Sequence, residues 1–259
     1  MQRIALISHG KDSLAMLEAI HRLKLPLDRI VTVDIMATPC TRGELPEMVE
    51  FKERADAEIL KRYGVKVEHL RAKKSFEEQF YSKKTKGKRT GEIYGFPMTT
   101  RAWCNDRLKM QPLNQFKPSE VLRYIGIAAD EKERIERQAG KKDVVLPLVQ
   151  VGWTEQMCYD WCKENNLLSP VYSDGFRDGC WFCPKQPIEQ LRRIRKEHPD
   201  KWSKMLEWDK DSPVPFNANG YTLRDFDKRF AMEDKLLVPK SKAFRWSMLR
   251  QEEQRSEVG

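Results

Sequence analysis

Apolar runs of strand length alternate with stretches of helical periodicity along the first part of the chain. Residues 3–7 form an apolar run that ends at a Ser/Gly turn, and residues 14–20 then carry apolar side chains at helical spacing. Further strands are predicted at residues 29–34 and 65–70, with a helix between them that ends at Gly64. This alternation predicts an α/β fold, a twisted parallel sheet with right-handed crossovers and helices on both faces.

The rest of the chain has a different pattern. Residues 73–100 are polar, rich in lysine and interrupted by glycine, which predicts a mobile excursion that is either a lid or a passive insertion. Another strand is predicted at residues 121–127, and a helix capped by a threonine at residues 154–166. The sequence that follows is helical and charged. We therefore expect a sheet domain over residues 1–184 and a helical C-terminal extension over residues 185–259.

The formal net charge of the chain is +9 over 259 residues, which favours a polyanionic partner. The basic residues gather in two dense clusters, at residues 83–89 and 192–196. Each cluster has two interpretations, a contact surface for nucleic acid or a solvated face with no partner.

Six cysteines and the absence of a long apolar segment bear on the cellular compartment. No window of the sequence approaches the length of a membrane span, and the first residues are not apolar, so we expect a soluble, cytoplasmic protein that binds no membrane. In such a chain six cysteines indicate reduced thiols, a metal site or catalysis rather than a disulfide framework.

The turn after the first strand has the chemistry of a phosphate-binding loop. Gly10 lets the backbone approach an anion closely, and the unpaired amides and dipole of the following helix favour negative charge. Lys11 adds a full positive charge, while Ser8 and Ser13 add hydroxyl donors. The spacing is not that of a Walker loop, so a P-loop kinase or GTPase is excluded.

This stretch, Ser8-His9-Gly10-Lys11-Asp12-Ser13, resembles the S-G-G-K-D-S signature of the PP-loop ATP pyrophosphatases, a superfamily that also holds the sulfonucleotide reductases. His9 stands where the signature has its first glycine. The resemblance implies that the loop binds the phosphates of an adenine nucleotide with Mg²⁺, and that Lys11 and Asp12 serve catalysis. It also implies that the loop after the second strand, with Asp34 and Thr38, and Gly126 at the end of a later strand complete the nucleotide site.

Two later segments are similar to sulfonucleotide-reductase sequences. Residues 101–113 contain a cysteine followed by basic residues and Pro-Leu, and residues 121–134 form a strand ending in a G-I-x-A-D-E-x-x-R pattern. The resemblance implies that Arg107, Lys109 and Arg134 face phosphate or sulfate, with Asp130 and Glu131 orienting them or a metal. The alternative for Asp130, Glu131 and Arg134 is a helix N-terminus with ordinary i,i+3 pairing.

The segment Gly179-Cys180-Trp181-Phe182-Cys183-Pro184 contains a C-x-x-C turn, which supplies half of a tetrahedral metal site. The family resemblance implies a 4Fe-4S cluster with Cys104 as a further ligand. Trp103 replaces the cysteine that would complete the set, so Cys162 is a candidate fourth ligand. Zinc and a metal-free pair of thiols remain the alternatives. Cys158, on the same helix face as Cys162, is expected to be a buried thiol.

The chain is most similar to phage and mobile-element members of the phosphoadenosine phosphosulfate (PAPS) reductase family. The retained Lys11-Asp12 pair and a C-terminal tail without cysteine favour an ATP pyrophosphatase, which forms AMP and pyrophosphate while activating an acceptor. The acceptor is expected to be a nucleic acid, DNA or tRNA, that receives sulfur from a donor protein. The alternatives are a reductase of PAPS or adenylyl sulfate (APS) that releases sulfite, and a nucleotide-binding accessory protein of a phage or defence system without catalysis.

Overall fold

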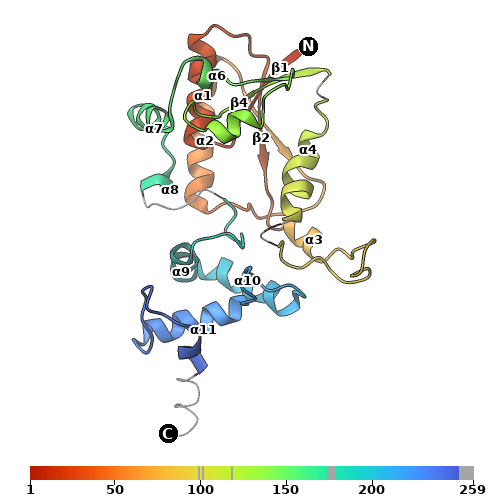
Figure 1. Cartoon of the computed structure of the whole chain (residues 1–259), viewed down its shortest axis with the longest axis vertical. Helices are drawn as coiled ribbons and strands as arrows, with labels where there is room; N and C mark the ends of the chain where they lie inside the picture. Colours follow the sequence, from red (N-terminus) through yellow and green to blue (C-terminus); the bar gives the residue numbers. More distant parts are fainter. Residues whose placement is uncertain (99, 101, 118, 174–178, 251–259) are drawn as a thin grey trace. The chain divides into compact units, whose positions relative to one another are not determined.

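The computed structural model describes residues 1–98, 100, 102–117, 119–173 and 179–250. The chain divides into two compact units, one made of residues 1–77 and 104–180 and the other of residues 78–103 and 181–259 (Figure 1). The second unit thus takes in residues 78–103, a segment that the sequence placed within the first domain.

The first unit is built on a five-stranded parallel sheet, which confirms the predicted fold class. Its strand order is β3-β2-β1-β4-β5. The strands are β1 (Gln2–Leu6), β2 (Arg29–Asp34), β3 (Val67–Arg71), β4 (Val121–Ile125) and β5 (Val144–Val145). Because β1 pairs with β2 on one side and β4 on the other, the chain leaves the central strand in both directions, and a crevice opens at the carboxyl ends of β1 and β4.

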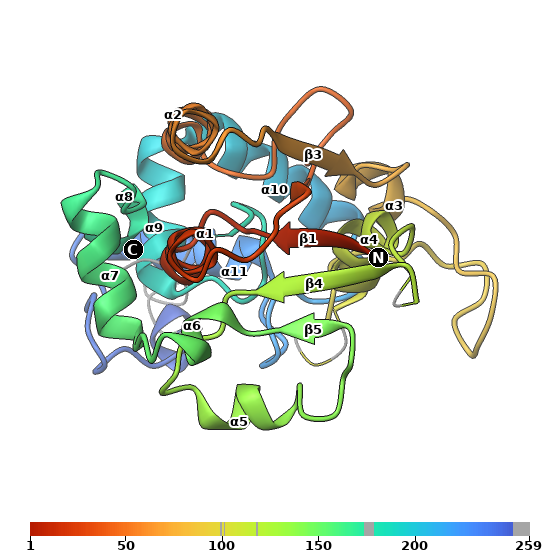
Figure 2. The ribbon, with the colours of Figure 1, turned by 90° about the horizontal axis from the view of Figure 1, so that it is seen from above.

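Helices cover the sheet on both faces (Figure 2). The longer ones in this unit are α1 (Lys11–Arg22), α2 (Pro46–Tyr63) and α7 (Glu155–Glu164), and the shorter ones are η1 (Asn105–Met110), α4 (Gln111–Leu113), α5 (Lys132–Glu136), α6 (Pro147–Gln150) and α8 (Pro170–Ser173). As predicted, Gly64 ends α2 in a left-handed conformation and Thr154 caps α7. Among the described residues, no helix combines the length and apolar composition needed to span a bilayer.

The two faces of the sheet bury alternate residues of the same strands. On β1, Ile4 packs in the cluster that holds Val121 and Phe116, whereas Ala5 packs in the larger cluster with α1, α2 and α7. On β2, Val31 packs in the cluster with Ile4, and its neighbour Ile30 packs in the larger cluster with Ala5. This period of two is what a strand with both faces covered requires, and it explains the continuous apolar runs in the sequence.

The second unit is helical and has an aromatic core. Its helices are α9 (Ile188–Glu197), α10 (Pro199–Asp211) and α11 (Leu223–Asp234). Trp181 and Trp208 stack with ring centroids 5.4 Å apart, and the rings of Phe80 and Phe96 meet edge to face at 5.4 Å. The expected mobile excursion at residues 73–100 is therefore wrong in part, because the buried aromatic residues of this segment form core contacts, and residues 76–80 form the helix α3 (Phe76–Phe80).

Candidate nucleotide-binding site

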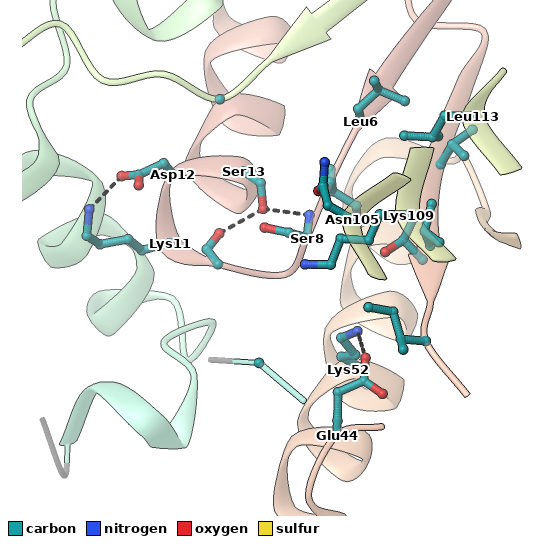
Figure 3. A pocket seen from close by; sticks show the side chains of 18 of the residues that line it. Leu6, Ser8, Lys11, Asp12, Ser13, Glu44, Lys52, Asn105, Lys109 and Leu113 are labelled. Atoms are coloured by element: carbon teal, nitrogen blue, oxygen red, sulfur yellow. Dashed lines mark hydrogen bonds and ion pairs between the residues drawn. The ribbon is translucent and has the colours of Figure 1, made fainter. Parts of the chain in front are cut away.

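The phosphate loop lies between the end of β1 at Leu6 and the start of α1 at Lys11. Ser13 closes it, since its hydroxyl donates to the Gly10 carbonyl at 2.9 Å and accepts from the Ser8 amide at 3.2 Å (Figure 3). The loop thus presents the free amides of the first turn of α1 toward the crevice. Backbone amides at a helix N-terminus form an anion site without further side chains.

A pocket of about 790 Å³ lies against this loop within the first unit, a size typical of small-molecule sites. Its walls come from the phosphate loop, the end of β2, α2, η1, α7 and the C-x-x-C segment. The polar and cysteine side chains in the lining are Ser8, Lys11, Asp12, Ser13, Thr32, Glu44, Lys52, Asn105, Lys109, Arg134, Glu155, Tyr172 and Cys180. The structure therefore brings together Ser8, Gly10, Lys11, Asp12, Ser13, Lys109, Gly126, Arg134 and Cys180 from the predicted site.

Lys11 is held between two carboxylates. Its ammonium lies 2.7 Å from Asp12 Oδ1 and 3.0 Å from Glu155 Oε1. Burial opposes its charge, but the bonds to the two carboxylates outweigh burial and raise the pKa of Lys11. Burial also raises the pKa of Asp12. Lys11 is therefore a charged group that can exchange these carboxylates for phosphate oxygens.

Gly126 allows the chain after β4 to touch the start of α1. A Cβ at this position would lie 2.7 Å from the carbonyl oxygen of Asp12, which no real contact tolerates. This close approach brings the carboxyl end of β4 against the phosphate loop. The requirement for glycine thus comes from the packing of two loops that are 114 residues apart in the chain.

His9 does not face the pocket, although the sequence placed it among the nucleotide-binding residues. Its φ of 61° is the left-handed conformation that glycine adopts without strain. The side chain is fully buried, and Nε2 lies 2.7 Å from Asp56 Oδ1 on α2. Burial lowers the pKa of His9. The loop therefore keeps its glycine-like backbone with a histidine in place.

Asp34 and Thr38 lie outside the pocket lining as well. The Asp34 carboxylate is buried and accepts two hydrogen bonds from the guanidinium of Arg42, at 2.7 and 2.9 Å. It also lies 3.0 Å from Nδ1 of His69. Thr38 accepts from the amides of Cys40 and Thr41 through its hydroxyl oxygen. Both side chains thus shape the β2 loop through protein contacts.

The segment after Cys104 forms the π-helix η1, a rare form that often occurs at functional sites. Lys109 extends from it into the pocket, together with Asn105 (Figure 3). Arg107, predicted with Lys109 as an anion ligand, is not in the lining.

Asp130 and Glu131 make local structural contacts. Asp130 accepts from the backbone amide of Glu155 at 3.0 Å, which caps the start of α7. Glu131 bonds to the Ala128 amide and pairs with Arg134 three residues on. Arg134 lines the described pocket, whereas Asp130 and Glu131 do not.

Sequence reasoning missed the ion pair of Glu44 and Lys52. The two side chains are buried on the pocket wall, with Nζ of Lys52 2.6 Å from Oε1 of Glu44. The sequence does contain a signal for a buried charge here, because Lys52 interrupts the apolar stripe of α2 between Met48 and Ala55. A lysine on the buried face of an amphipathic helix needs a partner.

The predicted cysteine ligands fall into three environments. Cys180 lines the pocket, and a Cβ at Gly43 would lie 3.3 Å from its sulfur. Cys104 belongs to the same unit, while Cys183 belongs to the second unit. Cys162 is buried in the sheet core, donates to the Lys11 carbonyl at 3.3 Å and has its pKa raised to about 12 by burial.

Cys158 is buried beside Cys162, as expected. Burial also raises the pKa of Cys158 to about 12. In the part of the chain that the structure describes, no three His, Cys, Asp or Glu side chains are grouped as metal ligands. The donor set expected for a cluster is therefore not assembled among these residues.

The two basic clusters of the second unit differ in their partners. On α9, Arg192 pairs with Glu189 and Glu233, and Arg195 pairs with Asp227 and Asp234. The cluster at residues 83–89 lies on a hairpin closed by the bridge between Lys83 and Ile93. Among the described residues, no carboxylate is paired with Lys83, Lys86 or Lys88, and all three side chains are exposed.

Comparison with known proteins gives a family match and two distant relatives. The family described as phosphoadenosine phosphosulfate reductase domain matches residues 2–186, which include every strand of the sheet and the C-x-x-C segment. Two uncharacterised proteins of Methanocaldococcus jannaschii, MJ0066 and MJ0973, are 29% and 24% identical over 76% and 61% of this chain. The matched region covers only 39% of the length of each relative.

The chain aligns weakly with a solved structure. The U34-tRNA thiolase NcsA from Methanococcus maripaludis, determined with its 4Fe-4S cluster, aligns with 93% of this chain and 74% of its own. The sequence identity is 14% and the TM-score is 0.38, so the overlap gives no residue-by-residue correspondence.

Proposed function

Because the chain belongs to the phosphoadenosine phosphosulfate reductase domain family, we propose that it is an ATP pyrophosphatase that activates an acceptor for sulfur transfer. The observation that carries the proposal is Lys11 in the phosphate loop, a charged ammonium whose partners among the described residues are the carboxylates of Asp12 and Glu155. A site that binds a sulfonucleotide has no β,γ-pyrophosphate to neutralise. The Lys11-Asp12 pair therefore favours a triphosphate.

The reaction forms one bond at the α-phosphorus and breaks another. An acceptor oxygen attacks the α-phosphate, the bond to the bridging oxygen breaks, and pyrophosphate leaves with the electron pair. A sulfide-level sulfur nucleophile from a donor protein then bonds to the acceptor atom that carries the adenylated oxygen. The bond from that atom to the oxygen breaks, and AMP leaves with the oxygen and the electron pair. The amides of α1 and the Lys11 ammonium, once it exchanges its carboxylate partners for phosphate oxygens, stabilise the negative charge that develops on pyrophosphate.

The pocket offers groups for the other parts of the nucleotide complex. Mg²⁺ neutralises phosphate charge when bound, and the carboxylates of Asp12 and Glu155 are oxygen ligands of the kind it prefers. Lys109 and Arg134 line the same pocket and supply positive charge for further phosphate oxygens. These residues suit a polyanionic ligand better than a neutral one.

The second candidate is a sulfonucleotide reductase, and the position of Cys180 favours it. Such an enzyme needs a thiolate that attacks the sulfate sulfur, and Cys180 is the cysteine that lines the described pocket. The third alternative is a nucleotide-binding accessory protein without catalysis. A distorted phosphate loop would favour it, but His9 has the left-handed backbone that glycine adopts.

Equilibrium binding separates the first two candidates. With Mg²⁺ present, we expect ATP to bind more tightly than PAPS or APS, and Lys11→Ala to weaken ATP binding about tenfold to a hundredfold, the effect of one charged hydrogen bond. Lys163→Ala, an exposed lysine on α7, is the matched control and should bind as the wild type does. Tightest binding of PAPS or APS would instead establish the reductase.

The cysteine site is tested by metal content. We propose that Cys104, Cys180 and Cys183 bind a 4Fe-4S cluster, and we derive no catalytic step through it because the described residues do not assemble the donor set. Anaerobically purified protein should contain iron and acid-labile sulfide, and Cys180→Ser should lose both. Cys40→Ser, at an exposed cysteine, is the control. Zinc, or no metal, in the wild type would exclude the cluster.

A further inference from the structure

We propose that Asp56 is a positioning residue of the phosphate loop, which it holds in its active shape through the buried side chain of His9. The proposal rests on the proposed function, since the loop is taken to bind the phosphates of ATP. It explains how this chain retains a phosphate loop with histidine at a position where glycine is the natural residue.

The backbone supplies the first step of the argument. With φ at 61°, His9 has a conformation that is strained for residues with a Cβ, so some contact of the side chain must stabilise it. Among the described residues, the side chain makes one hydrogen bond, from Nε2 to Asp56 Oδ1 at 2.7 Å. This bond ties the loop to the middle of α2.

The chemistry of the pair identifies the proton that makes the bond. A carboxylate oxygen can only accept, so Nε2 carries the proton and donates it to Asp56. Nδ1 of His9 is then the unprotonated nitrogen, and it is buried with no hydrogen-bond partner among the described residues. A buried lone pair is less costly to leave unpaired than a buried charge, which agrees with a neutral ring.

Asp56 is itself held in place by His69 on β3, whose Nε2 lies 2.8 Å from Asp56 Oδ2. Hydrogen bonds to Asp34 and Asp56 raise the pKa of His69 to about 9. Burial opposes the charge of Asp56, but the bonds from His69 and His9 outweigh burial and lower its pKa to about 2. A charged pair of Asp56 and His69 thus forms a fixed support for the neutral His9.

Further hydrogen bonds and ion pairs connect His69 to Glu44 and Lys52, which line the pocket. His69 bonds to Asp34, Asp34 to Arg42, and Arg42 Nε lies 3.5 Å from Glu44, which pairs with Lys52. Lys52 lies one helical turn before Asp56 on α2, which closes a ring of six residues, namely Asp56, His69, Asp34, Arg42, Glu44 and Lys52. His9 is attached to this ring through Asp56. The ring explains why Asp34 is buried in protein contacts instead of facing the ligand.

Substitutions at residue 9 separate positioning from general stability. His9→Ala keeps a Cβ but removes the anchor, so ATP affinity should fall about tenfold, the size of the left-handed penalty for a residue with a Cβ. His9→Gly also removes the imidazole, but glycine adopts this backbone conformation without strain, so the ATP affinity of this variant should stay near that of the wild type. A merely structural histidine would make both variants equally weak.

The decisive variant is Asp56→Ala in two backgrounds. In the wild type it should weaken ATP binding about tenfold, whereas in the His9→Gly background it should have no further effect, because glycine needs no anchor. Equal loss in both backgrounds, or no loss in either, would overturn the proposal. Thermal unfolding of each variant confirms that the measured protein is folded.

A second measurement works without nucleotide and so separates this inference from the proposed function. Hydrogen exchange of the amides of Ser8 and Leu14, which bond within the loop, should accelerate in Asp56→Ala and His9→Ala but much less in His9→Gly. If the wild type bound none of the three nucleotides, the function would fail while this pattern still supported the anchor. Unchanged exchange in Asp56→Ala would overturn the anchor alone.

Discussion

Replacing Glu233 with alanine is expected to destabilise the second unit by about 3 to 5 kcal/mol, the cost of removing one partner from a buried ionic group. Glu233 is 1% exposed on α11 and accepts from Arg229 at 2.7 Å and from Arg192 at 2.6 and 2.7 Å. Its loss would leave two arginines without their shared carboxylate. Arg229 also lies 3.5 Å over the Phe244 ring, so the C-terminal segment should loosen with it.

Denaturant unfolding of the full chain measures this effect. The matched control is Glu197→Ala, which removes the partner of Arg193 on the surface of α9 and should change stability by less than about 1 kcal/mol. Glu233→Gln keeps the shape and loses the charge, and should fall between the two. Similar values for Glu233→Ala and Glu197→Ala would contradict the assignment of a buried ionic core.

The same carboxylate should make the unit sensitive to acid. Burial disfavours the charged form of Glu233, but bonds from Arg192 and Arg229 outweigh burial and lower its pKa. A group whose pKa is lower in the folded state stabilises that state above the unfolded pKa, and this contribution is lost as the pH falls through the folded pKa. The difference in stability between wild type and Glu233→Gln should therefore shrink in acid.

Reversing the charge of Lys83, Lys86 and Lys88 together should weaken binding to nucleic acid on the order of a hundredfold near physiological salt. These three exposed lysines lie on the hairpin, whereas the α9 arginines Arg192 and Arg195 are neutralised by their own carboxylates. We therefore propose that the acceptor is a nucleic acid and that the hairpin is its contact surface. Three lost phosphate contacts should also reduce the slope of log affinity against log salt by about two to three.

A control with the same change of charge separates a local contact from the overall charge. Lys61, Lys66 and Lys142 are exposed lysines of the first unit, and reversing them alters the net charge equally, from +9 to +3. Binding of bulk tRNA and of duplex DNA, measured over a range of salt concentrations, should fall much less in this control. An equal fall in both triple variants would show that only net charge matters.

Much of the fold was predictable because its signals are local. The strands β1 to β4, the helix that ends at Gly64 and the capped helix α7 follow from apolar periodicity and turn chemistry within short windows, whereas β5, with two residues, was not predicted. The same holds for the phosphate loop, where the strand, the turn and the helix are adjacent in sequence. The expected excursion at residues 73–100 was the main error in the fold, since Phe80 and Phe96 pack against each other and also against Trp208 and Phe216, which lie far away in the sequence.

The candidate site was predictable only where one segment supplies it. Lys11, Asp12 and Ser13 line the pocket as expected, because they start the helix that faces the crevice. Asp34 and Asp130 carry the right chemistry, but tertiary contacts with Arg42 and with the start of α7 occupy their carboxylates. Lys52 was missed because its position on the apolar stripe of α2 signals a buried charge but does not say that Glu44, just before the helix, is its partner.

By itself, then, the sequence determined the parallel α/β sheet, the position of the phosphate loop and the family, since each depends on residues close together along the chain. Only the tertiary structure decided which charges remain available. His9 points into the core toward Asp56, and the α9 arginines are neutralised by carboxylates about 30 to 40 residues away. The physical reason is that an ionic or strained group takes its character from its partners, and a linear pattern does not say where those partners lie.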